Sequence, residues 1–274
     1  MKIRLIGGLM AALIGLGSTT ALAAAGKAIP AQDWSFGGAF DIFGAFDRGA
    51  QQRGFQVYKE VCAGCHSLDL IAFRNLADLG FNEDEIKAIA AEYTIVDGPD
   101  DDGEMFERAG RPSDTFPAPF PNAKAAAAAN GGAAPPDLSL MAKARSRGPD
   151  YLYALLTGYA DLPDDWENVE EFSYISEEFK DPKFELLESL NFNHYFPGHQ
   201  IAMPPPLSED GVEFADGTPA TVEQMAADVS HFLMWAAEPN LEHRKAMGIK
   251  VILFLIVFTA LLYAVKRKVW ADLH

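Results

Sequence analysis

The segment Cys62-Ala63-Gly64-Cys65-His66 constrains this chain more than any other stretch. C-x-x-C-H is the spacing at which two thiols attach a haem through thioether bonds while the next histidine ligates the iron. Two intervening residues let both sulfurs reach the vinyl-derived carbons, and the adjacent imidazole then lies beneath the iron. The segment therefore predicts one covalent haem c, with Cys62 and Cys65 as attachment points and His66 as an axial ligand.

The same cysteine spacing occurs in two other kinds of site. C-x-x-C serves thiol redox chemistry near a βαβ unit, and four Cys or His ligands can hold zinc. Cys62 and Cys65 are the only cysteines, so no second pair completes a zinc site, and no βαβ pattern precedes the motif. The sequence favours haem over a redox dithiol or a chance match.

The charge of the chain bears on its partners. The 274 residues carry a formal net charge of −17, whereas phosphate binding relies on clustered Lys and Arg. This balance argues against a nucleic-acid partner and favours a basic protein partner. The hydrophobic share of 49% is ample for a core.

The N-terminus has the pattern of a secretory signal. Lys2 and Arg4 precede an apolar run from Leu5 to Leu16, and the small-residue site Ala21-Leu22-Ala23 follows. We expect a signal peptide at residues 1–23, with Ala25 as the alternative cleavage site. The mature chain is then exported.

The C-terminus contains an apolar segment, residues 247–265, that is long enough to cross a bilayer. The alternative, a buried core helix, finds no later segment to cover it. Basic residues flank both ends equally, so the signal peptide decides the orientation. We expect a single-pass membrane protein with an exported haem domain at residues 24–240 and a cytoplasmic tail at 266–274.

Apolar periodicity predicts several helices in the mature chain. One runs from Arg48 into the haem motif, a second begins after Asn82 in a capping box, a third spans Pro149 to Gly158, and the last begins near Thr218 or Thr221 and ends at Pro239. Residues 97–132, rich in Asp, Gly, Pro and Ala, are expected to form a surface loop excursion.

An acidic run occupies residues 161–188, with aromatic residues interspersed. Such a run is usually a solvated face. The alternative is a docking surface whose negative potential speeds the encounter with a cationic electron carrier.

The second axial ligand decides whether the iron transfers electrons or binds small molecules. Met203 is followed by three prolines, which fix an extended backbone and can hold a thioether rigidly against iron. His194 and His199 are the alternatives, although Asn193 to Gly198 is more typical of a structural turn. The other methionines lie in polar loops or on helix faces, where packing is the better explanation.

The haem propionates require counter-charge or hydrogen bonds. Arg145 and Arg147 are the best-placed basic residues between the ligands.

Taken together, the motifs resemble cytochrome c1, the haem subunit of the cytochrome bc1 complex (ubiquinol–cytochrome c reductase), of the alphaproteobacterial type. The resemblance covers nearly all of the mature chain, and the matching segments are Cys62–His66, Asp97–Pro99, Gly103–Phe106, Asn130–Ser139, Leu155–Tyr159, Tyr195–Gly198, Ala202–Met203, Asp216–Thr221 and Trp235–Pro239.

This resemblance implies an all-α, cytochrome c-like haem domain with long loop insertions and one C-terminal transmembrane helix. It implies His66 and Met203 as axial ligands and Arg145 near a propionate. Four further residues are then expected to line the haem pocket: Asn130, Pro135, Pro136 and Tyr151.

The implied activity passes one electron from the Rieske iron-sulfur protein to cytochrome c during ubiquinol oxidation, in a complex with cytochrome b. Some bacterial members of this family carry an extra disulfide between the haem motif and the methionine loop, and no cysteine remains for it here. No nucleophile or paired-carboxylate site stands out, so we expect no bond-making catalysis in this subunit.

Several functions remain as alternatives. One is a free-standing anchored cytochrome c or the haem subunit of a terminal oxidase, which the long interval between His66 and Met203 disfavours. The others are a structural assembly subunit and a sensor with an open sixth iron site.

Overall fold

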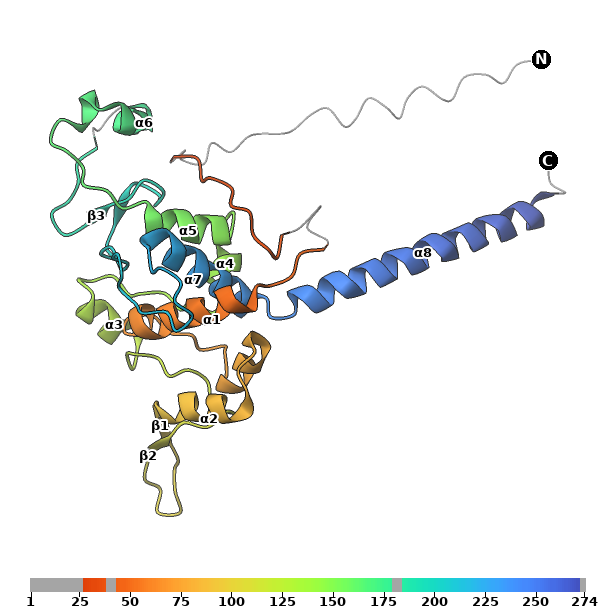
Figure 1. The fold of residues 1–274 in the computed structure, drawn as a ribbon, viewed down its shortest axis with the longest axis horizontal. Helices are drawn as coiled ribbons and strands as arrows, with labels where there is room; N and C mark the ends of the chain where they lie inside the picture. The colour runs from red at the N-terminus through yellow and green to blue at the C-terminus, as the bar shows by residue number, and fades with distance from the viewer. Residues whose placement is uncertain (1–26, 38–42, 179–183, 272–274) are drawn as a thin grey trace.

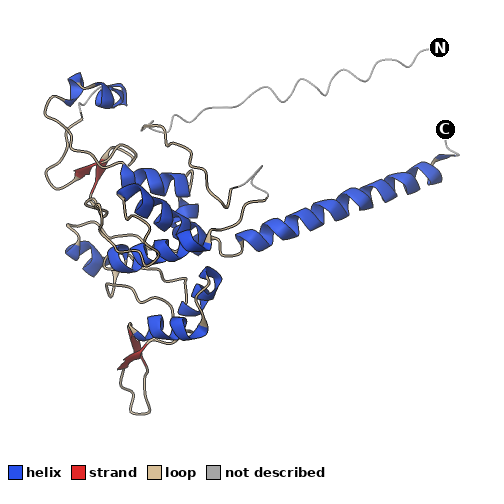
Figure 2. Cartoon of the chain, viewed as in Figure 1, coloured by secondary structure: helices blue, strands red, loops and turns tan. Residues whose placement is uncertain are grey.

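The computed structural model describes residues 27–37, 43–178 and 184–271. Helices dominate this part of the chain, which also contains two small antiparallel two-stranded sheets, β1–β2 and β3–β4 (Figure 2). The predicted all-α class with one long C-terminal helix is confirmed. The predicted signal peptide, residues 1–23, and both of its candidate cleavage sites lie outside the described residues.

The elements follow in chain order, with short 3-10 helices between some of the α-helices (Figure 1). The elements are α1 (Arg48–Val57), a π-helix (Tyr58–Cys62), a 3-10 helix (Phe73–Leu79), α2 (Glu83–Ala91), β1 (Thr94–Asp97), β2 (Phe106–Ala109), α3 (Ala123–Ala129), α4 (Met141–Ala144), α5 (Pro149–Thr157), 3-10 helices (Trp166–Asn168 and Glu170–Phe172), α6 (Ser173–Glu178), β3 (Asn191–Phe192), β4 (Gln200–Ile201), α7 (Val222–Ala237) and α8 (Leu241–Val269).

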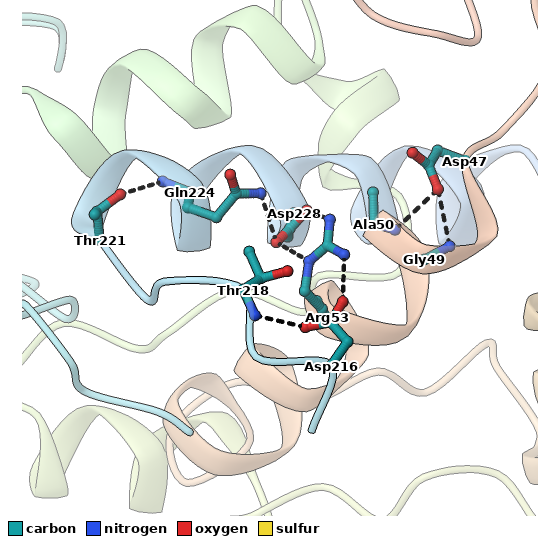
Figure 3. A network of polar contacts seen from close by, with 9 residues as sticks. All are labelled: Asp47, Gly49, Ala50, Arg53, Asp216, Thr218, Thr221, Gln224 and Asp228. Atoms are coloured by element: carbon teal, nitrogen blue, oxygen red, sulfur yellow. Dashed lines mark hydrogen bonds and ion pairs between the residues drawn. The ribbon is translucent and has the colours of Figure 1, made fainter. Parts of the chain in front are cut away.

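The crossing of α1 and α7 forms the centre of the domain, where Gly54 permits close approach of the two helices. A Cβ built on Gly54 would lie 2.0 Å from the carbonyl oxygen of Asp228 on α7, so only glycine fits there. Beside it, Arg53 donates from Nε to the Asp228 carboxylate at 2.8 Å and from Nη1 to Asp216 at 2.8 Å (Figure 3). Close packing at Gly54 and the ion pair between Arg53 and Asp228 therefore both hold α1 against α7.

Side-chain caps define the starts of the helices, as polar residues before apolar runs predict. Asp47 accepts from the backbone of α1, and Thr221 accepts from Gln224 at the start of α7 (Figure 3). The predicted capping box at Asn82 is present at α2. At α7 the structure selects Thr221 over Thr218 as the cap.

Aromatic side chains from several elements fill the main core. Phe55 and Tyr58 from the first helical segment contact Phe232 on α7, and both also contact Phe116 from a distant loop. These rings are almost wholly buried and close the region behind the haem motif.

The predicted surface excursion at residues 97–132 is wrong in two places. Residues 123–129 form the helix α3, capped by Asn122, because alanine has the highest helix propensity and outweighs the low complexity. Asp97 ends strand β1, which pairs with β2 in a hairpin. Arg108 on β2 binds both Asp97 and Asp114, which ties this hairpin to the following loop.

The acidic run at residues 161–188 folds around a second, smaller core, made by Phe172, Ile175, Phe184 and Phe192. Several acidic side chains described there face solvent (Asp161, Asp164, Asp165, Glu167, Glu170 and Glu171), whereas the side chain of Glu178 is only 9% exposed and contacts His199. Residues 179–183 of this run lie outside the described residues. The described part is thus an acidic surface over an apolar centre.

The C-terminal helix α8 extends away from the body of the molecule as a single long rod (Figure 1). By length and composition it can cross a membrane, and its apolar stretch is not covered by the rest of the described chain. The helix is longer than the predicted span of 247–265 because its first turns pack on the domain. There Lys245 Nζ donates to the carbonyl of Phe36 at 2.5 Å, and Glu242 pairs with Arg48 at 2.9 Å.

Candidate haem site

The haem motif begins where the first helical segment ends. The π-helix closes at Cys62, whose carbonyl then accepts from the backbone N–H groups of Cys65 at 3.1 Å and His66 at 2.9 Å. This tight turn carries both thiols and the imidazole. Cys62 is half-buried, Cys65 is exposed, and neither forms a disulfide bond. Burial, with a smaller contribution from Cys65, raises the pKa of the Cys62 thiol to about 12.

The imidazole of His66 is oriented by a backbone carbonyl. Its Nδ1 lies 2.8 Å from the carbonyl oxygen of Pro136, which can only accept, so Nδ1 carries the proton. This tautomer leaves the lone pair of Nε2 for iron. Burial lowers the pKa of His66, which favours the neutral form that ligates metals. The structure therefore brings His66 and Pro136 together.

Sequence reasoning did not identify Asp137, which binds the segment that follows the motif. Its carboxylate accepts from Ser67 Oγ at 2.8 Å and from the N–H groups of Asp69 and Ser139, each at 2.9 Å. Burial opposes ionisation, but these hydrogen bonds outweigh it and lower the pKa of Asp137. The acidic residue directly after two prolines in Asn130–Ser139 was the available signal.

Arg145 and Tyr151 also lie together. Burial raises the pKa of the Tyr151 hydroxyl, and a hydrogen bond and the charge of Arg145 partly oppose that shift. Tyr151 is buried, whereas Arg145 is exposed and keeps donors for another acidic group. The other candidate, Arg147, pairs with Asp150 at 3.3 Å.

The remaining predicted pocket residues make fewer contacts. Asn130 is half-buried and ends helix α3, where its side-chain amide donates to the carbonyl of Ala126 at 2.8 Å. Pro135 is half-buried beside the exposed Pro136. The hydrogen bond of Asn130 gives it a structural role at the start of the loop that carries Pro136, the residue whose carbonyl contacts His66.

The backbone of Met203 is held in place by polar side chains. Its carbonyl accepts from the Tyr159 hydroxyl at 3.1 Å and from the Asn191 amide at 3.4 Å. The side chain is half-buried, and Pro204 to Pro206 continue without helix or strand. Tyr159 and Asn191 are thus supports for the methionine loop that sequence reasoning missed.

The two alternative ligands, His194 and His199, have both ring nitrogens engaged. Nδ1 of His194 lies 2.6 Å from the Tyr174 hydroxyl, and its Nε2 lies 3.4 Å from Glu171. His199 contacts the Asn193 carbonyl at 3.1 Å through Nδ1 and Glu178 at 3.0 Å through Nε2. These contacts favour the predicted structural turn over a ligand role.

The donor set suits a haem c. Thiols are the groups that can attach a porphyrin, and an imidazole and a thioether are groups that can ligate its iron. A zinc site finds no support in residues 27–37, 43–178 and 184–271, where no three His, Cys, Asp or Glu side chains gather to hold a metal ion.

Comparison with known proteins gives one consistent result. The sequence model of the Cytochrome C1 family matches residues 34–273. The chain is 50% identical to "Cytochrome c1" of Rhodospirillum rubrum over 272 residues, which cover 95% of this chain and 96% of that protein.

Two further relatives carry more descriptive names. "Cytochrome b/c1" of Bradyrhizobium diazoefficiens is 50% identical over 266 residues, covering 89% of this chain and 36% of that longer protein. "Cytochrome b-c1 complex catalytic subunit, mitochondrial" of Candida albicans is 46% identical over 245 residues, covering 89% and 78%.

Proposed function

The chain belongs to the Cytochrome C1 family, and from that premise we propose that it is the haem-bearing electron-transfer subunit of a cytochrome bc1 complex. The observation that carries this proposal is the orientation of His66, which follows Cys65 directly in the sequence. Its Nδ1–H donates to the carbonyl of Pro136. Bound haem would supply one-electron chemistry at its iron.

The residues have separate tasks in this proposal. Cys62 and Cys65 hold the porphyrin covalently, while His66 and Met203 fill the axial positions. Arg145, supported by Tyr151, provides counter-charge for a propionate. Asn130, Pro135 and Pro136 shape the loop against the ring.

Met203, as the proposed second axial ligand, affects the reduction potential of the haem. An axial thioether raises the reduction potential relative to a second imidazole, which suits a carrier placed late in a chain of electron transfers. The hydrogen bonds from Tyr159 and Asn191 support this ligand because they restrain the backbone at its position. In this proposal the haem supplies the redox chemistry, and the protein sets the reduction potential and the contact with partners without bond-making catalysis of its own.

We propose the Rieske iron-sulfur protein as the electron donor and cytochrome c as the acceptor. The exposed acidic surface at residues 161–171 supports a cationic acceptor, because opposite charge raises the encounter rate. Cytochrome b is the proposed membrane partner, since a relative is named "Cytochrome b/c1".

The proposed topology follows from the two ends of the chain. Residues 1–23 export the haem domain, residues 24–240, to the periplasm, and the segment 247–265 of α8 anchors it in the inner membrane. Residues 266–274 then lie in the cytoplasm. The basic residues in the last turn of α8, from Lys266 to Lys268, complement the helix dipole and suit a membrane interface, but equal basic charge flanks the other end, so the orientation rests on the proposed signal peptide.

A redox titration of the membrane-extracted holoprotein tests the ligand assignment. Met203→Leu removes the thioether, so we expect the low-spin spectrum to be lost or the potential to fall by some hundreds of millivolts, within the roughly 0.8 V range set by axial ligands. Met105→Leu is the matched control, because Met105 is exposed on the hairpin.

The outcomes separate the alternatives. An unchanged potential in Met203→Leu would place the second ligand elsewhere and contradict this proposal. A haem that stays redox-inert in the wild type would favour the structural subunit, and an open sixth position in the wild type would favour the sensor. A free-standing cytochrome would purify without cytochrome b.

A further inference from the structure

Two segments that are distant in sequence, residues 66–70 and 136–139, lie side by side at the candidate haem site. The N–H of Leu138 donates to the carbonyl of Ser67 at 2.9 Å, so their backbones are joined directly. The first segment follows the imidazole ligand, and the second begins with the carbonyl that orients that imidazole. Any change in their spacing therefore moves the carbonyl relative to the ring.

The carboxylate of Asp137 connects these two segments. Its Oδ2 accepts from the Ser67 hydroxyl at 2.8 Å and from the N–H of Asp69 at 2.9 Å. Its Oδ1 accepts from the N–H of Ser139, also at 2.9 Å. Two of the three bonds reach the segment of the ligand, and the third holds the carboxylate within its own loop.

An amide cannot replace this carboxylate. All three partners donate, and a carboxylate offers two accepting oxygens, whereas asparagine has one oxygen and an NH2 group that only donates. Substitution of Asp137 by Asn would therefore turn an NH2 group toward at least one N–H or O–H donor. The substitution would therefore lose at least one hydrogen bond of the carboxylate, and would weaken the contact between the segments without a large change in volume.

The carbonyl of Pro136 precedes Asp137 directly, so the position of the carboxylate also fixes that peptide unit. A hydrogen bond from Nδ1–H to a carbonyl increases the basicity of an imidazole ligand. A more basic ligand stabilises ferric iron relative to ferrous iron and lowers the potential. The strength of the contact between His66 and Pro136, 2.8 Å here, is thus a determinant of potential.

We propose that Asp137 is a positioning residue for the axial ligand His66, acting by holding the Pro136 carbonyl against the imidazole and thereby setting the reduction potential of the haem. This inference rests on the proposed role of His66 as an axial ligand. The carboxylate of Asp137 itself contacts Ser67, Asp69 and Ser139.

The test measures midpoint potential and thermal unfolding of the full-length holoprotein in three variants. Asp137→Asn removes the charge and at least one hydrogen bond of the carboxylate, and Ser67→Ala removes one of those bonds while keeping the charge. Asp69→Asn is the control for charge alone, because Asp69 joins the network through its backbone N–H and its side chain is exposed.

We expect Asp137→Asn to raise the potential, with about a tenfold change in the ferric to ferrous ratio, which is about 59 mV for one electron. Ser67→Ala should shift the potential in the same direction by less. Asp69→Asn should shift the ratio less than Asp137→Asn does.

Three results would overturn the inference. Equal shifts in Asp137→Asn and Asp69→Asn would show a simple effect of charge. A lower melting temperature with unchanged potentials would show a structural role alone. A fall in potential in Ser67→Ala would show that the field of the carboxylate outweighs its positioning.

If Asp137→Asn does not accumulate with haem, Ser67→Ala decides, since an unchanged potential there also refutes the role. A wild-type protein without low-spin haem would instead refute the proposed function. The two failures are therefore distinguishable.

Discussion

The contact between α1 and α7 makes Gly54→Ala a sharp test of the fold. The added Cβ would lie 2.0 Å from the carbonyl oxygen of Asp228 and 2.8 Å from the Cβ of Phe232. Such atoms in proteins stay at least 3.0 Å apart, and the obstacle is backbone, so the helices must separate by about 1 Å.

The magnitude follows from two opposing effects. Overpacking of this kind costs typically about 1–3 kcal/mol and more when backbone must move, whereas alanine is better than glycine in a helix by about 1 kcal/mol. Because the displacement also loosens the bonds between Arg53 and Asp228, we expect a net loss of about 2 kcal/mol or more.

Thermal unfolding of the full-length holoprotein, followed by circular dichroism, measures this loss. For a domain of this size, a loss of about 2 kcal/mol lowers Tm by about 4–8 °C. Gly49→Ala in the same helix is the matched control, because its nearest neighbours lie at 3.3 Å and 3.5 Å in flexible side chains. If Gly54→Ala unfolds within about 2 °C of Gly49→Ala, the close crossing is refuted.

Three further predictions concern buried polar groups. Asp228→Asn removes the charged partner of Arg53 at a site where Asp228 is only 2% exposed, so we expect the free energy of unfolding to fall by about 3–5 kcal/mol. Arg53→Met combined with Asp228→Leu should recover most of this loss, because no charge is then left unpaired. Additive losses in the double variant would contradict the prediction. Burial lowers the pKa of His231 to about 4, so protonation favours the unfolded chain: its contribution is complete above about pH 6.5 and lost as the pH falls toward 4, worth about 3 kcal/mol. His231→Gln should therefore show a smaller loss of stability between pH 6.5 and 4 than the wild type in denaturant titrations, and equal slopes would refute the burial of this ring. Asn193→Ala removes the side-chain partner of the Leu155 carbonyl and of the Tyr195 N–H, which should lower the local stability of the turn by about 1–3 kcal/mol. Limited proteolysis should therefore cut the turn at residues 195–198 faster than in the wild type, and an unchanged rate would count against these bonds.

Local patterns in the sequence were sufficient for several elements. The helices α1, α2, α5 and α7 follow from apolar periodicity and caps, because both signals act within a few residues. The long apolar helix α8 follows from composition alone, since a bilayer has a known thickness. The prediction of a haem c site likewise needs only the five consecutive residues of the C-x-x-C-H segment.

Other local signals were outweighed or too weak. Helix α3 formed in a segment that low complexity assigned to a loop, because alanine favours helix regardless of repetition. The strands of the β1–β2 hairpin lack strong alternation, and their pairing is completed by the bonds of Arg108 to Asp97 and Asp114. The pairing of these strands depends on contacts between side chains of different segments, and the sequence pattern of a single strand does not reveal such contacts.

The sequence by itself determined the family resemblance and predicted which residues would serve a haem: two thiols and an imidazole at fixed spacing, and a methionine followed by prolines. Only the tertiary structure decided how those groups are supported. It brought Pro136 and Asp137 to a histidine about 70 residues away and engaged both nitrogens of His194 and His199 in other contacts. The physical reason is that hydrogen bonds between distant segments depend on loop closure and packing of the whole chain, which no local periodicity records.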